Sequence, residues 1–495
     1  MLNDVKNVKF GRLAAEREID EGLRKYFLET GAFVRLRDGE KSILLGNRGS
    51  GKSAIIKMLS DYYKQKGCLV IELLPEDYSY EMLKKTSISK NEEKWIKVSS
   101  YTAAWKYLLY VIAMKLYIQN INTVVKSNAK PIYDYIRKNH KGYDKQSNWG
   151  ILTNYIKRIE GIKIGTYEAG IKTKQLQELY KLEDINNLLP SLKMLTKRKP
   201  IIFLIDELDK GWDASDEAQA FIGGLFQASV TLNQLSEKFK VIISLRKELY
   251  DNIPLLYEDY QKYNDMFEII EWNRDNLFEL ITKRIGFSLP LTKEKTNIEK
   301  WNTVFLNQIQ GEKTFDYIIN RTLNRPRELI QFCIDSKERA EEIRADKIDI
   351  NAIVSSEVKY SDKRTKDIAM EYKFQYPNIL SVFEIFRGKD SIICRNDLEQ
   401  LILSNLKKGN VIRDCDSWLT NQTEEFLITV LWQIGFLKIH TTCYNINGEF
   451  KKGFYGINET NQSNIGNVEN FMIHPMFRMY LGVIDSKVSP SSADL

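Results

Sequence analysis

Cysteine and histidine are scarce in this chain of 495 residues, with five of the first and three of the second. The cysteines are scattered without a C-x-x-C pair, and the histidines form no cluster. Zinc sites are usually built from such pairs and clusters, so the sequence argues against one. Scattered cysteines also fit a reducing compartment better than an oxidising one.

Long hydrophobic runs are lacking too. The longest apolar stretch, residues 107–118, is interrupted by Lys115 and falls short of the roughly 20 residues that cross a bilayer. Residues 1–4 show neither the basic start nor the apolar run of a signal peptide. We therefore expect a cytoplasmic protein without membrane contact.

Positive charge is concentrated in one segment. The net charge is +7, yet residues 81–200 hold 23 Lys and Arg against 10 Asp and Glu, whereas residues 361–495 hold 15 against 16. The basic segment also contains seven aromatic residues of interest: Trp95, Tyr101, Trp105, Tyr133, Tyr135, Tyr143 and Trp149. Basic and aromatic residues together suit nucleic acid, so segment 81–200 is a candidate nucleic-acid-binding region. The alternative is a set of helical hairpins with aromatic cores and lysine-covered outer faces.

Residues 46–53 fit the phosphate-binding pattern G-x-x-x-x-G-K-[ST]. An apolar run precedes them and a helical pattern follows, which is the strand, loop and helix that this motif requires. Lys52 is predicted to reach the β- and γ-phosphates, and Ser53 to offer its hydroxyl to Mg²⁺. The predicted nucleotide contacts are Gly46, Asn47, Arg48, Gly49, Ser50, Gly51, Lys52, Ser53 and Ala54.

A second apolar run, residues 201–205, ends in carboxylates. Asp206 is predicted to hold Mg²⁺, and Glu207 to orient and deprotonate the attacking water. The alternative is a buried strand that runs into an acidic helix cap.

Two further signals are basic or polar residues at element ends. Ser244 and Arg246 close the apolar run 241–245, where either could read the γ-phosphate or the water; the alternative is an exposed strand end. Arg325 and Arg327 flank Pro326 at a helix start, where the helix dipole disfavours cations, so a role at the nucleotide is the stronger interpretation. The predicted catalytic set is Lys52, Asp206, Glu207, Ser244, Arg246, Arg325 and Arg327, with Mg²⁺ on Ser53 and Asp206.

Alternating apolar and helical patterns predict a three-layer α/β domain. The expected strands are 42–45, 68–74, 201–205, 240–245 and 267–270. The expected domains are a core of residues 1–77 and 200–271, a basic helical insertion 78–199, a helical part 272–372, a mixed part 373–485 and a disordered tail 486–495.

Together these motifs resemble the AAA+ ATPase superfamily, and within it the branch of the replication-origin initiators and the STAND signalling ATPases. More narrowly, the chain is similar to bacterial P-loop ATPases of unassigned biochemistry, some near defence genes. The resemblance implies a parallel sheet ordered 5-1-4-3-2, a helical lid at 272–372 and a winged-helix-like domain at 373–485. It also implies that Gly11, with Ala15 and Glu16, belongs to the adenine side of the site.

The chain departs from the initiator pattern at the fourth strand, where initiators usually have Asn; Ser244 and Arg246 are closer to the STAND pattern. No arginine finger stands out, although Arg274 is a candidate. Two functions stay open: an ATPase acting on DNA or a partner protein, with phage defence as one setting, and a slow STAND-like switch that assembles with an effector. Homo-oligomers or an effector protein are the expected partners.

Overall fold

The computed structural model describes the following residues: 4–74, 94–120, 126–139, 182–253, 256, 263–309, 311–407, 415, 417–444, 450–460 and 465–484. The chain divides into two compact units. The unit that we call the sheet unit contains Glu29–Asn47 and Gly51–Ile270. The other, the helical unit, contains Met1–Leu28, Arg48–Ser50 and Glu271–Leu495.

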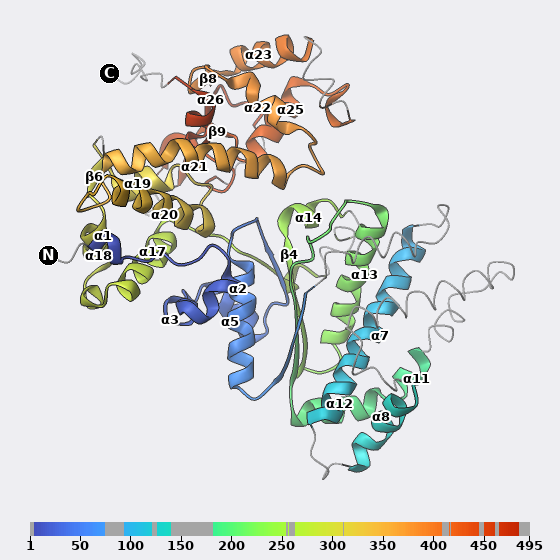
Figure 1. The fold of residues 1–495 in the computed structure, drawn as a ribbon. Coiled ribbons are helices and arrows are strands. Elements are labelled where there is room, and N and C mark those ends of the chain that lie inside the picture. Colours follow the sequence, from blue (N-terminus) through green and yellow to red (C-terminus); the bar gives the residue numbers. More distant parts are fainter. Residues whose placement is uncertain are drawn as a thin grey trace. The chain divides into compact units, whose positions relative to one another are not determined.

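The sheet unit is built on five parallel strands (Figure 1). They are β1 (Ile43–Gly46), β2 (Leu69–Leu73), β3 (Ile201–Ile205), β4 (Phe239–Arg246) and β5 (Phe267–Ile269). Their order is β2-β3-β4-β1-β5, which read from the other edge is the predicted order 5-1-4-3-2. Every residue of β1 and β3 is buried, which explains why both read as unbroken apolar runs.

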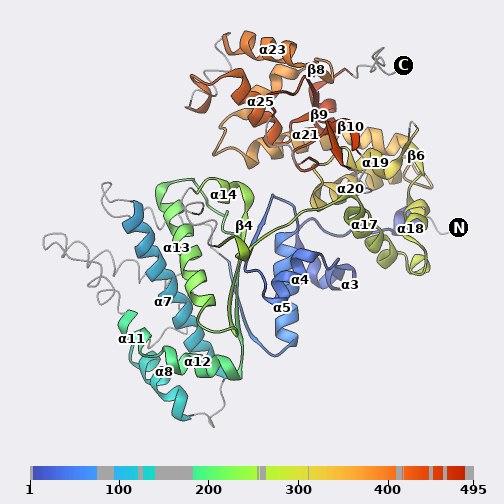
Figure 2. The same cartoon turned by 180° about the vertical axis from the view of Figure 1, so that it is seen from behind.

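Helices cover this sheet, and the described part of the predicted insertion supplies four of them. The described helices of the sheet unit are α4 (Gly31–Asp38), α5 (Lys52–Gln65), α7 (Lys94–Asn120), α8 (Lys126–Asn139), α11 (Leu182–Asn186), α12 (Leu189–Arg198), α13 (Asp216–Asn233), α14 (Lys247–Asp251) and the short η4 (Asn264–Met266). Helices α7 and α13 lie side by side in both views (Figures 1 and 2).

The aromatic residues of α7 form core rather than surface. Trp105 is fully buried and donates its indole N–H to the carbonyl oxygen of Phe221 at 3.1 Å. Tyr101 is buried as well, and α13 has Gly224 at this point, where a Cβ would come within 2.6 Å of the Tyr101 Cβ. Tyr101 and Trp105 are therefore not available to stack on bases, as the hairpin alternative anticipated. Tyr143, Trp149 and the side chain of Trp95 lie outside the described residues.

The helical unit starts with short N-terminal elements and continues as a helical array after residue 271. Its elements up to residue 371 are α1 (Asp4–Asn7), α2 (Ala15–Glu18), η1 (Ile19–Leu23), α3 (Arg24–Tyr26), α17 (Arg274–Ser288), η5 (Pro290–Thr292), α18 (Asn297–Val304), β6 (Gln308–Ile309), β7 (Glu312–Lys313), α19 (Thr314–Ile319), α20 (Pro326–Glu342) and α21 (Ile350–Glu371). The segment predicted to be a helical lid is thus mostly helical.

The C-terminal part combines helices with an antiparallel sheet ordered β10-β9-β11-β8. Its elements are α22 (Ile379–Phe383), η6 (Glu384–Phe386), β8 (Ile392–Cys394), α23 (Arg395–Lys407), α25 (Glu424–Gln433), β9 (Leu437–Tyr444), β10 (Phe450–Tyr455), β11 (Asn470–Ile473) and α26 (Pro475–Leu481). This part therefore contains both helices and strands. The winged-helix assignment stays a prediction, and the predicted disordered tail lies outside the described residues.

Each unit encloses one hydrophobic core. Across the described ranges, no helix is long and apolar enough to pass through a membrane.

Candidate nucleotide site

The phosphate-binding loop is shaped by two glycines. Gly49 and Gly51 have φ angles of 81° and 98°, values that residues with a Cβ rarely adopt. Gly51 is the residue directly before α5, so the main chain turns at that point into the helix. Ser53 and Ala54, in the first turn of α5, are half-buried. The amino end of α5 therefore faces the loop, as anion-binding helices require.

Lys52 is seated inside this turn. Its Nζ donates hydrogen bonds to the carbonyl oxygens of Gly46 at 2.9 Å and Asn47 at 3.1 Å. Burial lowers the pKa of Lys52, and the negative charges of Glu248 and Asp206 act in the opposite direction. The ammonium is thus held next to the loop main chain and close to acidic groups.

The two carboxylates after β3 have different settings. Asp206 is buried, and its amide donates to the Leu73 carbonyl oxygen at 3.3 Å. Glu207 is half-buried and has a φ of 59°, which is unusual for a residue with a side chain. Such backbone strain is concentrated at functional sites, where the surrounding structure imposes it.

Ser244 and Arg246 lie beside the start of the loop because β4 is the neighbour of β1. Ser244 pairs in register with Leu44, and Arg246 with Gly46. The Ser244 hydroxyl is buried and has no hydrogen-bond partner in the described part of the chain. Arg246 forms an ion pair with Asp209 and a second one with Glu248 at 3.4 Å.

Sequence reasoning missed the roles of Asp209 and Glu248. Asp209 stands in the acidic motif but had no assigned partner, and Glu248 had no signal beyond its place two residues after Arg246. Both become visible only when the ends of β3 and β4 are brought together.

These residues fit a magnesium nucleotide. The glycine turn and Lys52 offer donors to phosphate oxygens, and the orphaned hydroxyl of Ser244 offers one more. Oxygen ligands suit Mg²⁺, and Ser53 with Asp206 would supply two of them. The described residues contain no group of three or more His, Cys, Asp or Glu that could hold a metal alone, so substrate and water oxygens would complete the shell.

The tip of the loop, Arg48–Ser50, belongs to the helical unit. Three donors of that unit bind its carbonyl oxygens. Arg325 Nη1 contacts Arg48 at 3.3 Å, the Arg327 amide contacts Gly49 at 3.3 Å, and Trp272 Nε1 contacts Ser50 at 2.7 Å. Sequence reasoning missed Trp272, which precedes a helix and carries no motif.

Arg325 is buried and paired. Its guanidinium contacts Glu371 at 2.7 Å and Glu328 at 3.8 Å. Burial acts to lower the pKa of Arg325, but attraction to Glu371 and Glu328 outweighs it, so the pKa is raised. Arg327 is half-buried, and its Nε donates to the Leu13 carbonyl oxygen at 3.2 Å. The two arginines that the motif treated alike therefore differ: Arg325 is locked between helices, and Arg327 lies at the surface.

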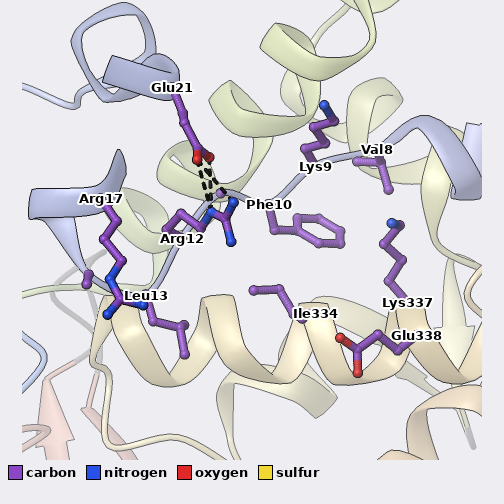
Figure 3. A pocket seen from close by; sticks show the side chains of 12 residues that line it. Val8, Lys9, Phe10, Arg12, Leu13, Arg17, Glu21, Ile334, Lys337 and Glu338 are labelled. Atoms are coloured by element: carbon purple, nitrogen blue, oxygen red, sulfur yellow. Dashed lines mark hydrogen bonds and ion pairs between the residues drawn. The ribbon is translucent and has the colours of Figure 1, made fainter. Parts of the chain in front are cut away.

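A cavity of about 540 Å³ lies in the helical unit between the N-terminal segment and α20 (Figure 3). Phe10, Leu13 and Ile334 give it an apolar wall, and Arg12 is paired with Glu21 at its rim at 3.1 Å. The other lining residues are Val8, Lys9, Gly11, Ala14, Arg17, Lys337 and Glu338.

Gly11 is required where the N-terminal segment bends beside this cavity. Its φ is 87°, and an added Cβ would lie 1.7 Å from Glu18 Oε1. Glu18 is buried and accepts from the Arg12 amide at 3.0 Å and the Tyr26 hydroxyl at 2.7 Å, and it also pairs with Arg284. The segment is therefore fixed by a buried network.

Arg274, the candidate arginine finger, is engaged in its own unit. Its Nε lies 2.5 Å from Asp316 Oδ1, and its guanidinium lies 5.2 Å from the centre of the Phe315 ring.

The sheet order and the glycine loop after β1 decide the fold. It is the predicted three-layer α/β fold of a P-loop NTPase, with the sheet order 5-1-4-3-2. Two family models match parts of the chain: residues 275–369 match the FunZ-associated C-terminal helical domain, and residues 1–96 match a protein of unknown function, DUF815.

Among known proteins, the chain is similar to the putative transposon gamma-delta 80.3 kDa protein of Escherichia coli (strain K12). The two are 23% identical over 530 residues, which covers 99% of this chain and 69% of that protein. Among solved structures, that of the Aeropyrum pernix ORC2 protein (ADPNP–ADP complexes) matches at 9% identity and a TM-score of 0.36, over 94% of this chain and 91% of that one. A TM-score this low supports no inference about the present chain.

Proposed function

We propose that the chain binds ATP with Mg²⁺ and hydrolyses it. The observation that carries the proposal is Lys52, held by two loop carbonyl oxygens with Asp206 and Glu248 as its acidic neighbours. Such a preorganised cation next to main-chain donors favours a triphosphate over a neutral ligand.

Each side chain then has a defined task. Lys52 neutralises charge on the β- and γ-phosphates, and Ser53 and Asp206 hold Mg²⁺, which would supply further charge neutralisation there. Glu207 takes the proton of the attacking water, and its strained backbone fixes where the carboxylate can lie.

The residues at the end of β4 would respond to the γ-phosphate. Ser244 has a free buried hydroxyl among the described residues, and Arg246 is positioned by Asp209 and Glu248. We assign Ser244 a direct contact and Arg246 a charge-stabilising one.

Arg325 and Arg327 would hold the loop tip, Arg48–Ser50, within the helical unit. Arg325 acts as a positioning residue because it joins the Arg48 carbonyl oxygen to Glu371 at the end of α21. Arg327 keeps the direct role toward nucleotide that the motif suggested. A change in the loop tip on hydrolysis would thereby reach α21 and act on DNA or on a partner protein.

The alternative is a slow STAND-like switch that assembles with an effector or with copies of itself. Arg246 favours it, because two carboxylates hold its guanidinium and would have to release it before it contacts phosphate. The relative's description as a transposon protein fits action on DNA, whereas phage defence rests on the family resemblance alone.

The test is phosphate release from Mg-ATP by the purified chain, with Glu207→Gln and the matched control Glu237→Gln, an exposed residue at the other edge of the sheet. Glu207→Gln should still bind ATP but hydrolyse it at least ~100-fold more slowly, since it loses the general base. The control should match the wild type. Wild-type turnover in Glu207→Gln would place the base elsewhere, and co-purified ADP with negligible turnover would favour the switch.

A further inference from the structure

Positive charge is concentrated at the amino-terminal ends of strands β2, β3 and β4, the end of the sheet opposite the phosphate-binding loop. Strands β2, β3 and β4 are parallel and start in register: Leu69 pairs with Ile201, and Ile201 with Phe239. The residues just before these starts are therefore neighbours, although they come from three distant segments. They include Lys66, Lys199 and Lys238.

Hydrogen bonds join these segments directly. The Leu69 amide donates to the Pro200 carbonyl oxygen at 2.8 Å, and the Ile201 amide to that of Lys238 at 2.9 Å. Lys238 Nζ also donates to the Lys197 carbonyl oxygen at 3.1 Å, at the carboxyl end of α12. A helix carboxyl end attracts cations, which favours basic side chains at this position.

Helix α8 extends the same surface. It packs against α12 (Figures 1 and 2), and its Ile132 is fully buried. Its outer face exposes Lys130, Arg137 and Lys138. We define the amino-edge surface by its exposed cations: Lys66, Lys130, Arg137, Lys138, Lys193, Lys197, Arg198 and Lys238.

Few acidic residues offset this charge. On the described parts of these elements the exposed acids are Asp134 and Glu237, with Asp184 on the neighbouring α11, while Asp38, Glu40 and Asp265 lie before β1 and β5 at the same end of the sheet. The side formed by β2, β3, β4 and α8 therefore carries eight exposed cations against three exposed acids among the described residues, a net positive charge that attracts polyanions such as nucleic acid.

The chemistry of the surface favours duplex over single-stranded nucleic acid. Single strands are bound largely by stacking of bases on exposed aromatic rings. Tyr101 and Trp105 are buried in the core, and on α8 only Tyr133 exposes a large ring, at 47% of its surface. What the surface offers is ammonium and guanidinium groups, which bind regularly spaced phosphates.

The C-terminal part is a weaker candidate for the same role. Helix α25 begins with Glu424 and Glu425 and contains no Lys or Arg. A helix of this charge is repelled by phosphate.

We propose that the amino-edge surface binds the phosphate backbone of double-stranded DNA without reading its sequence. This proposal names duplex DNA as the partner in the proposed function, and it rests on the proposed function for that partner alone. The surface and the nucleotide loop lie at opposite ends of the strands, about 17 Å apart for the five residues of β3. The two sites can therefore be damaged separately.

The test is the fluorescence anisotropy of a labelled 30-base-pair duplex, titrated with nucleotide-free protein at several salt concentrations. The variant combines Lys66→Gln, Lys197→Gln, Arg198→Gln and Lys238→Gln. The matched control combines Lys293→Gln, Lys295→Gln, Lys359→Gln and Lys389→Gln, which are exposed lysines of the helical unit. A second variant on α8 combines Lys130→Gln, Arg137→Gln and Lys138→Gln and keeps the test valid if the first variant folds poorly.

Each lost phosphate contact should reduce the slope of log K against log salt by about 0.9. The first variant, with four contacts removed, should thus lose about 3.6 in slope and at least ~10-fold in affinity near 100 mM salt, while the control keeps both. Unchanged binding in both surface variants, or equal loss in the control, would overturn the proposal. So would tighter binding to a single strand, or binding to phosphatidylserine vesicles with none to the duplex.

Titration of the same variants with Mg-ATP separates the two proposals. Duplex binding without ATP binding would contradict only the proposal that the loop binds nucleotide. ATP binding without duplex binding would contradict only the proposal that the amino-edge surface binds DNA.

Discussion

Arg246 and Arg325 come from equivalent sequence signals, a basic residue at the end of an element, yet their surroundings differ. Arg246 ends β4 in the sheet unit, beside the phosphate loop, and keeps about a fifth of its side chain exposed while it pairs with Asp209 and Glu248. Arg325 is almost fully buried in the helical unit, between Glu371 and the loop tip. A partly exposed arginine can exchange partners, whereas a buried one is bound to its own because an unpaired buried charge is very unfavourable. The first is therefore suited to chemistry and the second to structural coupling.

The largest effect should come from breaking the buried pair. Glu371→Ala leaves Arg325 without its closest carboxylate, so the free energy of unfolding should fall by about 3–5 kcal/mol. Urea unfolding followed by tryptophan fluorescence measures it. The double variant Arg325→Met/Glu371→Leu should recover most of the loss, because apolar residues replace both charges.

The control for this prediction is Glu342→Ala, which removes an exposed ion pair with Arg339 and should change stability by less than ~1 kcal/mol. If Glu371→Ala has the wild-type free energy of unfolding, the Arg325–Glu371 pair does not stabilise the helical unit, and the contrast between the two arginines is removed.

A second effect should appear in hydrolysis rather than in stability. Arg246→Ala should slow phosphate release by about 100–1,000-fold, the scale of losing one charge-stabilising donor, with ATP affinity changed little. Arg246→Lys keeps the charge, so its rate of phosphate release should lie between those of the wild type and Arg246→Ala. If Arg246→Ala instead unfolds the protein while its turnover per folded molecule is normal, the residue is structural like Arg325.

The smallest effect concerns pH. His474 in the helical unit is buried, and its Nδ1 accepts from the Met476 amide at 3.1 Å. Burial, together with the charges of Lys438 and Arg478, holds the pKa of His474 well below its ordinary value. The unfolded chain then binds one more proton below about pH 6.5, so stability should fall by about 1.4 kcal/mol per pH unit as the pH drops further.

His474→Asn can still accept the Met476 hydrogen bond and should flatten this dependence in unfolding measured between pH 7.5 and 5.5. His440→Asn is the matched control, since His440 is less buried and burial lowers its pKa less completely. Identical pH dependence in the wild type and His474→Asn would show that His474 does not cause the loss of stability at low pH.

The sequence predicted the sheet well because each strand is a short apolar run with polar ends, and burial on both faces leaves little other use for such runs. The loop was predictable because its turn requires glycines at positive φ angles, and Lys52 follows them at the fixed spacing of the motif. Partners were not predictable where they depend on tertiary contact: Glu371 follows Arg325 by 46 residues, and Glu248 meets Arg246 and Lys52 only across strand ends. Composition left both alternatives open for Tyr101 and Trp105, since a basic segment with aromatic rings looks the same whether the rings face solvent or the core.

Calorimetric titration with Mg-ATP decides whether the loop that contains Lys52 binds nucleotide, using the wild type, Lys52→Ala and the control Lys66→Ala. We expect saturable binding near one ATP per chain for the wild type and for Lys66→Ala, and none for Lys52→Ala. Binding by Lys52→Ala at wild-type affinity would contradict it, since the cation between the Gly46 and Asn47 carbonyl oxygens would then hold no phosphate.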